Sequence, residues 1–150
     1  MTKPIEQTRR EFIEKIGLIA QVDGLPRIAG RVLGLLVWDG EAVAFGDIAS
    51  QLLVSRGSVS AATRILEDRR LIKRTTRAGD RQYFFQLSER PYESMMEGIA
   101  SSLALNQKDI DETVAEIPEE EAEIKARITE YSRFYQGLSK AVSTMINEMG

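Results

Sequence analysis

The chain has 150 residues, of which 43% are hydrophobic and 29% charged, the composition of an ordinary globular protein. It contains no cysteine and no histidine, which excludes disulfides and the usual ligand sets for zinc, haem and iron–sulfur clusters. The commonest general base and the Ser/His and Cys/His nucleophile pairs are absent for the same reason. We therefore expect no enzyme, no metal site and no cofactor.

No stretch approaches the roughly 18 apolar residues of a membrane span, and the most apolar run, residues 33–38, is far too short. The opening residues MTKPIEQTRREF lack the apolar segment that a signal peptide needs. We expect a cytoplasmic protein that makes no membrane contact.

Two helices are predicted before residue 45. The first covers residues 4–21, with an apolar stripe formed by Ile5, Phe12, Ile16 and Ile19. The second covers residues 26–38, with an apolar face formed by Ile28, Val32, Leu35 and Leu36. Gly30 and Gly34 lie inside it at a cost of up to ~1 kcal/mol each, so we expect another helix to approach closely there. Residues 42–44 are expected to add a short strand to a later sheet.

A helix-turn-helix is predicted next. Ile48, Leu52 and Leu53 have the spacing of one apolar face of a short helix over residues 47–53. Ser55 is a suitable N-cap for a second helix, because its hydroxyl can accept an orphan backbone N–H. The second helix starts at Arg56, and its inward residues are Val59, Ala62, Ile65 and Leu66. In such a motif the second helix enters the major groove of DNA.

A β-hairpin follows these helices. Residues 71–76 and 82–87 are rich in β-formers, and the turn sequence Arg-Ala-Gly-Asp-Arg lies between them. Helix, turn, helix and hairpin together form a winged helix. The predicted fold class is therefore mainly α (α+β), with a winged helix-turn-helix at its centre.

The outward side of the second helix favours DNA binding. It combines small residues, which let a helix sit deep in a groove about 12 Å wide, with arginines that can read guanine. Arginines at the hairpin tip can reach the neighbouring minor groove or phosphates. The predicted DNA-binding residues are Ser55, Arg56, Gly57, Ser58, Ser60, Ala61, Arg64, Arg77 and Arg81. The alternative is that the small residues are surface filler and the arginines are merely solvated.

Charge is segregated along the chain. Residues 46–90 contain nine basic and five acidic side chains, a net charge of +4, which leaves −7 for the rest of a chain whose total is −3. Screening acts over about 8–10 Å, so the local field decides DNA affinity. The negative total is no objection to DNA binding.

Two long helices are predicted after the hairpin. Ser88 is expected to cap the first, with Pro91 in its first turn. Its apolar residues are Tyr92, Met95, Met96, Ile99, Leu103, Ile110 and Val114. The acidic run around Pro118 is interpreted as a solvated face and a helix start, and not as a metal site.

The last helix carries a seam of apolar residues spaced alternately four and three apart: Ile124, Ile128, Tyr131, Tyr135, Leu138, Val142, Met145 and Met149. This 3.5-residue repeat is typical of helix–helix packing. It predicts a multi-helix dimer layer, and the alternative is a helix folded back onto its own subunit. The expected dimerisation residues are Phe12, Ile16, Ile128, Tyr131, Tyr135, Leu138, Val142 and Met145.

Three stretches together resemble the GbsR-like branch of the MarR family of bacterial transcription regulators. They are GLPRIAGR at residues 24–31, SRGSVS at residues 55–60 and GDRQY at residues 79–83. The resemblance covers about residues 5–87 and implies a homodimeric winged-helix protein that usually represses transcription. The wider family commonly has Asp-x-Arg in the wing, whereas here Arg81 directly follows Asp80 and Gln82 takes the later position.

The expected organisation has three parts. Residues 1–44 form N-terminal helices that belong partly to a dimerisation layer, residues 45–88 the DNA-binding domain, and residues 89–150 a C-terminal helical dimerisation region. The expected function is sequence-specific binding of double-stranded DNA by a homodimer at a pseudo-palindromic operator, with release by a small-molecule effector. The alternative is a winged-helix protein–protein interaction module without sequence-specific DNA binding.

Overall fold

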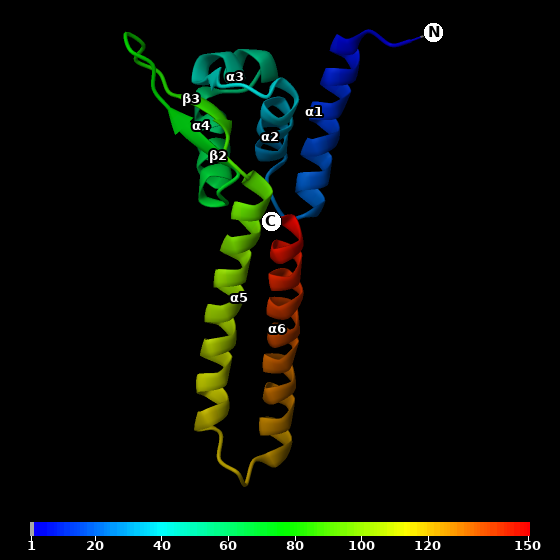
Figure 1. Cartoon of the computed structure of the whole chain (residues 1–150), viewed down its shortest axis with the longest axis vertical. Helices are drawn as coiled ribbons and strands as arrows, with labels where there is room; N and C mark the ends of the chain where they lie inside the picture. Colours follow the sequence, from blue (N-terminus) through cyan, green and yellow to red (C-terminus); the bar gives the residue numbers. More distant parts are fainter. Residues whose placement is uncertain (1) are drawn as a thin grey trace. The chain divides into compact units, whose positions relative to one another are not determined.

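The computed structural model describes residues 2–150, which form six helices and one small sheet (Figure 1). The chain divides into two compact units, Met1–Pro91 and Tyr92–Gly150. The mainly helical fold class with a winged helix-turn-helix is confirmed. Within residues 2–150 no helix is both long enough and apolar enough to cross a membrane.

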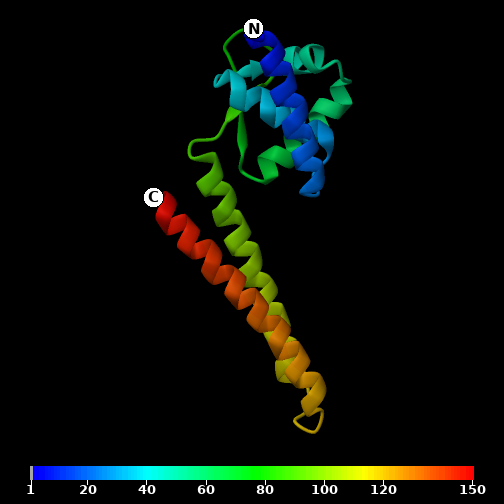
Figure 2. The ribbon, with the colours of Figure 1, turned by 90° about the vertical axis from the view of Figure 1, so that its right-hand side faces the viewer.

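The first unit contains the winged helix. Its elements are α1 Ile5–Val22, α2 Arg27–Asp39, β1 Val43–Ala44, α3 Phe45–Leu52, α4 Arg56–Asp68, β2 Ile72–Thr75 and β3 Phe84–Leu87. The strands pair antiparallel in the order β1-β3-β2, with β3 in the middle. Figure 2 shows the chain from a second side, turned by 90°. Phe85 of β3 lies opposite Val43 on one side and Arg74 on the other. The predicted short strand and hairpin are both confirmed.

Helices α1 and α2 approach very closely at Gly30. A Cβ atom at this position would lie 2.5 Å from the Ala20 Cβ and 2.7 Å from the Ile16 carbonyl oxygen. The close helix approach predicted from the glycines is confirmed. The side of α1 that is buried against α2 holds Ile13, Gly17 and Ala20. The stripe predicted for α1 is only partly covered, because Phe12 and Ile16 are half-buried whereas Ile5 and Ile19 are 65% and 50% exposed.

The core of the first unit lies among α2, α3, α4 and the sheet. Its most completely buried large side chains are Val32, Leu35, Leu36, Ile48, Val59, Leu66 and Phe85. Each such side chain stabilises the fold by about 1.5–3 kcal/mol when it is fully buried. The inward faces predicted for α2 and α4 supply most of this set.

Two local predictions are wrong. Leu53 was expected on the apolar face of α3, but the helix ends at Leu52, and Leu53 takes a left-handed conformation (φ 57°) with its side chain 90% exposed. Ser88 was expected to cap the helix after the hairpin. Its N–H instead donates to the Leu71 carbonyl and its hydroxyl to the Arg70 carbonyl, and the helix starts later, at Pro91.

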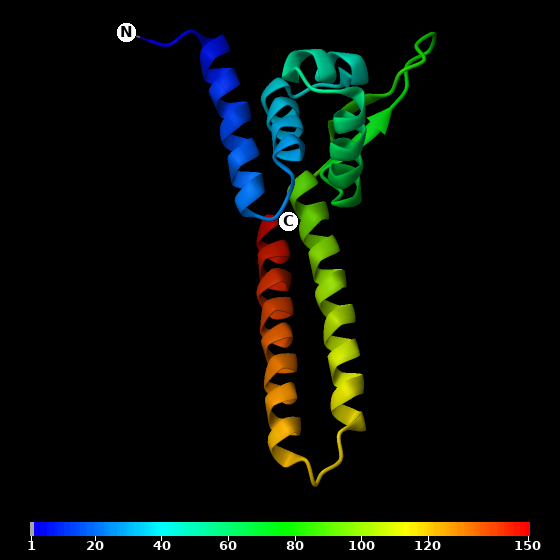
Figure 3. The same cartoon turned by 180° about the vertical axis from the view of Figure 1, so that it is seen from behind.

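The second unit is an antiparallel helical hairpin of α5 Pro91–Glu116 and α6 Ala122–Met149, which run side by side in Figures 1 and 3. Among residues 92–150 only Ser132 is buried, and its hydroxyl hydrogen-bonds to the Asp111 carboxylate. Many large apolar side chains of the hairpin are exposed, among them Leu105, Ile124, Tyr131, Phe134, Leu138 and Met145. The hairpin thus has almost no hydrophobic core of its own.

The conformation of Leu53 predicts a stabilising substitution. A left-handed φ costs an L-residue with a bulky side chain about 1–2 kcal/mol, whereas Asn adopts it readily. Leu53→Asn loses little burial, so the free energy of unfolding in urea should rise by about 1 kcal/mol. Leu18→Asn is the matched control, because Leu18 is 50% exposed within regular helix α1 and should give no gain. Equal effects of the two substitutions would contradict the interpretation.

Candidate nucleic-acid interface

Helix α4 begins with a complete side-chain cap. The Ser55 hydroxyl accepts a hydrogen bond from the Ser58 N–H at 3.1 Å, and it donates to the Ser58 hydroxyl at 2.9 Å. This contact satisfies one of the orphan N–H groups at the helix start. The predicted N-cap is confirmed. It fixes the N-terminal end of α4, which carries several of the predicted DNA-binding residues.

The predicted reading face of α4 is open to solvent. Arg56, Gly57, Ala61 and Arg64 are exposed, and Ser58 and Ser60 are half-buried. On the opposite side Val59, Ala62 and Leu66 are buried in the core. The sequence placed these residues on the correct sides of the helix, and no acidic side chain occurs on α4 before Glu67.

Arg56 is oriented by an aromatic ring. Its guanidinium carbon lies 4.7 Å from the centre of the Phe45 ring, a distance typical of a cation–π contact. Phe45 is the first residue of α3, so the two helices of the motif meet at this contact. Phe45 was not among the residues predicted from the sequence, where an aromatic residue before a short helix resembles ordinary core.

The hairpin tip carries the two predicted wing arginines. Gly79 has φ +82°, the left-handed conformation that this tight turn requires. The guanidinium of Arg77 stacks over the Phe84 ring at 4.2 Å, which ties it to the base of β3. Arg81 is exposed, and within residues 2–150 its side chain makes no hydrogen bond or ion pair. It is available to a phosphate or a groove.

Arg74 joins the wing to the end of α4. It donates two hydrogen bonds to the Glu67 carboxylate, both at 2.9 Å, and its guanidinium lies 4.5 Å from the centre of the Tyr83 ring. The hydrogen bonds that Arg74 donates to Glu67 raise the pKa of Arg74 above its usual value. Arg74 therefore belongs to the scaffold of the wing, and its charge is partly neutralised.

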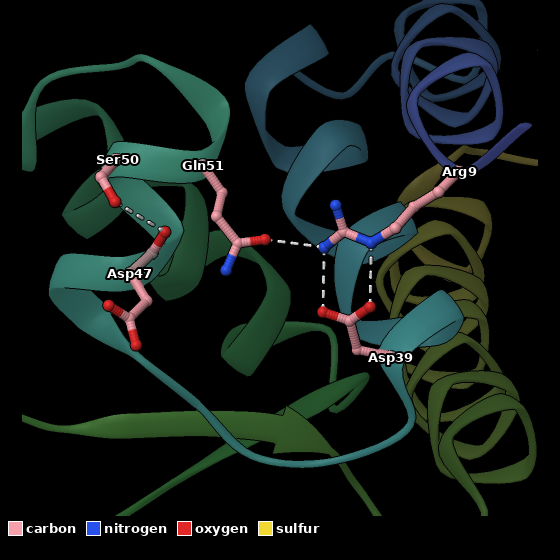
Figure 4. Close-up of polar contacts among 5 residues, drawn as sticks. All are labelled: Arg9, Asp39, Asp47, Ser50 and Gln51. Atoms are coloured by element: carbon pink, nitrogen blue, oxygen red, sulfur yellow. Dashed lines mark hydrogen bonds and ion pairs between the residues drawn. The ribbon is translucent and has the colours of Figure 1, made fainter. Parts of the chain in front are cut away.

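Helix α3 is tied to α1 and α2 by two arginines. Arg9 of α1 donates to both oxygens of Asp39 at 3.0 and 2.9 Å and to Gln51 of α3 at 2.7 Å; Figure 4 shows its guanidinium between these two partners. The Asp39 hydrogen bond raises the pKa of Arg9. Arg31 of α2 donates to Glu14 and to the Leu52 carbonyl at the end of α3.

The predicted dimerisation residues lie in both units. In the first, Phe12 packs against Trp38 with ring centres 5.5 Å apart, and Ile16 is half-buried. In the second, Ile128, Tyr135 and Val142 are half-buried, whereas Tyr131, Leu138 and Met145 are exposed. The rings of Tyr131 and Tyr135 contact each other edge to face, with their centres 5.3 Å apart.

Comparison with known proteins shows what the winged helix is similar to. Residues 23–82 match the sequence model of the MarR family. A stretch of 78 residues is 40% identical to the HTH-type transcriptional regulator MmpR5 of Mycobacterium tuberculosis (strain ATCC 25618 / H37Rv), covering 51% of this chain and 47% of that protein, about half of its length.

The fold of the whole chain is also shared with a solved structure. A crystal structure described as a transcriptional regulator superimposes with a TM-score of 0.83 at 25% sequence identity, and the match covers 95% of this chain and 97% of that one. The winged helix is therefore similar in sequence to that of MarR-family regulators, and the fold is similar to that of a transcriptional regulator.

The Arg9 bridge predicts a specific loss of stability. Arg9→Ala removes charged hydrogen bonds to the largely covered Asp39, so the free energy of unfolding should fall by about 1.5–3 kcal/mol. Arg10→Ala is the matched control. Arg10 is the next residue of the same helix, is exposed, and makes no hydrogen bond or ion pair within residues 2–150. Urea titration of both variants tests this, and equal losses would contradict the role of the bridge.

Proposed function

We propose that this protein binds double-stranded DNA sequence-specifically and regulates transcription, with α4 in the major groove and the wing beside it. The observation that carries the proposal is the outward face of α4. Its small residues allow deep entry into the groove, and Arg56 and Arg64 can donate to guanine O6 and N7. An interaction module for another protein would favour apolar or mixed-charge side chains there.

We further propose that the protein acts as a homodimer assembled through the hairpin of α5 and α6 with help from α1. The support is the hairpin's lack of a core: Tyr131, Phe134 and Leu105 are 52%, 58% and 64% exposed. Covering large apolar side chains is the dominant favourable term in association. A second copy presents the same seam and can cover it symmetrically.

A dimer of this kind would read two half-sites about one helical turn apart, roughly 34–36 Å between recognition helices. We propose that it represses transcription in the cytoplasm by occupying such a pseudo-palindromic operator, and the motifs at residues 24–31, 55–60 and 79–83 favour the GbsR-like branch. A small-molecule effector would release the protein from DNA only if it bound more tightly to a second conformation, whose half-site spacing does not match the operator, than to the DNA-binding conformation.

Loss of Arg64 tests the DNA proposal. After the preferred sequence has been found by in vitro selection, Arg64→Ala should weaken binding to it by ~1–3 kcal/mol, because a bidentate base contact is lost. Fluorescence anisotropy at fixed salt is the measurement. Arg69→Ala removes the same charge just beyond the C-terminal end of α4 and should cost much less. Failure of the wild-type protein to select any sequence would refute the proposal.

A charge placed in the α6 seam tests the dimer. Leu138→Lys puts an ammonium group among side chains that the second copy should cover, so the mass in solution should shift from dimer to monomer. Sedimentation equilibrium measures this directly. Gln136→Lys makes the same change at an exposed position of α6 outside the seam and should remain dimeric. A wild-type protein that is monomeric at all accessible concentrations would rule the dimer out.

A further inference from the structure

No side chain of its N-cap residue caps the start of helix α3. Its N-cap residue is Ala44, which has no polar side chain. The first N–H groups of a helix lack partners within the helix and need acceptors from elsewhere. Both acceptors come from the wing: the Phe45 N–H donates to the Tyr83 carbonyl at 2.9 Å, and the Gly46 N–H donates to Gln82 Oε1 at 3.0 Å.

Gln82 is itself fixed in place. Its backbone N–H donates to the Asp80 carboxylate at 3.0 Å, and its side chain is partly buried. A Cβ atom on residue 46 would lie 3.1 Å from Gln82 Oε1, which is tighter than ordinary contact. The glycine at position 46 therefore leaves room for the glutamine amide.

The same junction reaches the recognition helix. Arg56, the first residue of α4, lies over the ring of Phe45. A Cβ atom on Gly46 would come within 3.9 Å of Arg56 Nη1. The base of the wing, the start of α3 and the first arginine of α4 thus meet at two consecutive residues, Phe45 and Gly46.

We propose that Gln82 is a positioning residue that fixes the wing on the helix-turn-helix, so that Arg81 and the arginines of α4 meet one DNA duplex together. The inference rests on the proposed DNA-binding function. Gln82 acts through Gly46 and not by touching DNA, since its amide oxygen is already engaged at the helix start. Its amide oxygen accepts from the Gly46 N–H, as the side chain of an N-cap residue would do at other helices.

Amide exchange tests the contact directly. In Gln82→Met, which keeps the length and loses the acceptor, the Gly46 amide should exchange with solvent roughly 2- to 10-fold faster, the equivalent of one hydrogen bond. Gln86→Met is the matched control, because Gln86 lies on β3 and its side chain makes no hydrogen bond within the described residues. Gln82→Glu retains an acceptor and should retain protection. Unchanged exchange in Gln82→Met overturns the proposal.

A double-mutant cycle tests the consequence for DNA. Arg81→Ala is compared in the wild-type and Gln82→Met backgrounds by anisotropy across a salt series. A wing that is no longer fixed should lose the Arg81 contribution, so Gln82→Met alone should weaken binding roughly 2- to 10-fold and Arg81→Ala should then add little. Fully additive effects overturn the proposal while leaving DNA binding intact. No DNA binding by the wild-type protein overturns both proposals.

Gly46→Ala provides a second route if Gln82→Met does not fold. Alanine is favourable within a helix, and its Cβ would displace the Gln82 amide from the other side. The Arg81 contribution should shrink in this variant as it does in Gln82→Met. An Arg81 contribution of wild-type size would contradict the positioning role.

Discussion

The arrangement of the proposed DNA-binding face depends on how an eight-residue helix, α3, is held in place. Isolated helices shorter than about 12–15 residues are marginal in water, so α3 needs partners beyond its own hydrogen bonds. Ile48 and Leu52 bury its inner face, and polar groups from distant segments satisfy its ends. Gln82 and Tyr83 accept the N–H groups at its start, and Arg31 donates to the Leu52 carbonyl at its end. The position of α4 follows, because only three residues separate the two helices.

Periodicity and turn chemistry predicted most of the fold. The order of elements in the winged helix, the Ser55 cap and the close approach at Gly30 follow from interactions between residues near in sequence or from the physical cost of an unusual residue. Two local predictions failed. Leu53 continued an apolar pattern beyond the point where the helix ends, and Ser88 had the chemistry of a cap but found acceptors at Arg70. At Ser88 the local preference gave way to tertiary contacts, whereas at Leu53 the helix ends one residue before the apolar pattern does.

The polar scaffold of the site could not be predicted in the same way. Gln82 was noted only because it takes the place of the arginine in the Asp-x-Arg pattern of the family that the sequence resembles. Nothing in the sequence pairs it with Gly46, which lies 36 residues earlier. The Arg9–Asp39–Gln51 contact likewise joins three helices. Such contacts have no periodic signature, because they depend on which helix ends the tertiary fold brings together. The exposure of the α4 arginines could be predicted without the tertiary fold, because they lie on the side of the helix opposite its apolar residues.

The division of charge complements the division of apolar surface. Residues 92–150 contain twelve acidic and five basic side chains, so this unit holds the −7 that offsets the +4 of residues 46–90. Phosphates would be repelled by the hairpin and attracted by the winged helix. The apolar seam of α6 meanwhile favours a second copy of the same chain. In the proposed dimer, joining two winged helices would make the second half-site contact effectively intramolecular, so tight binding would require only moderate affinity from each face of α4.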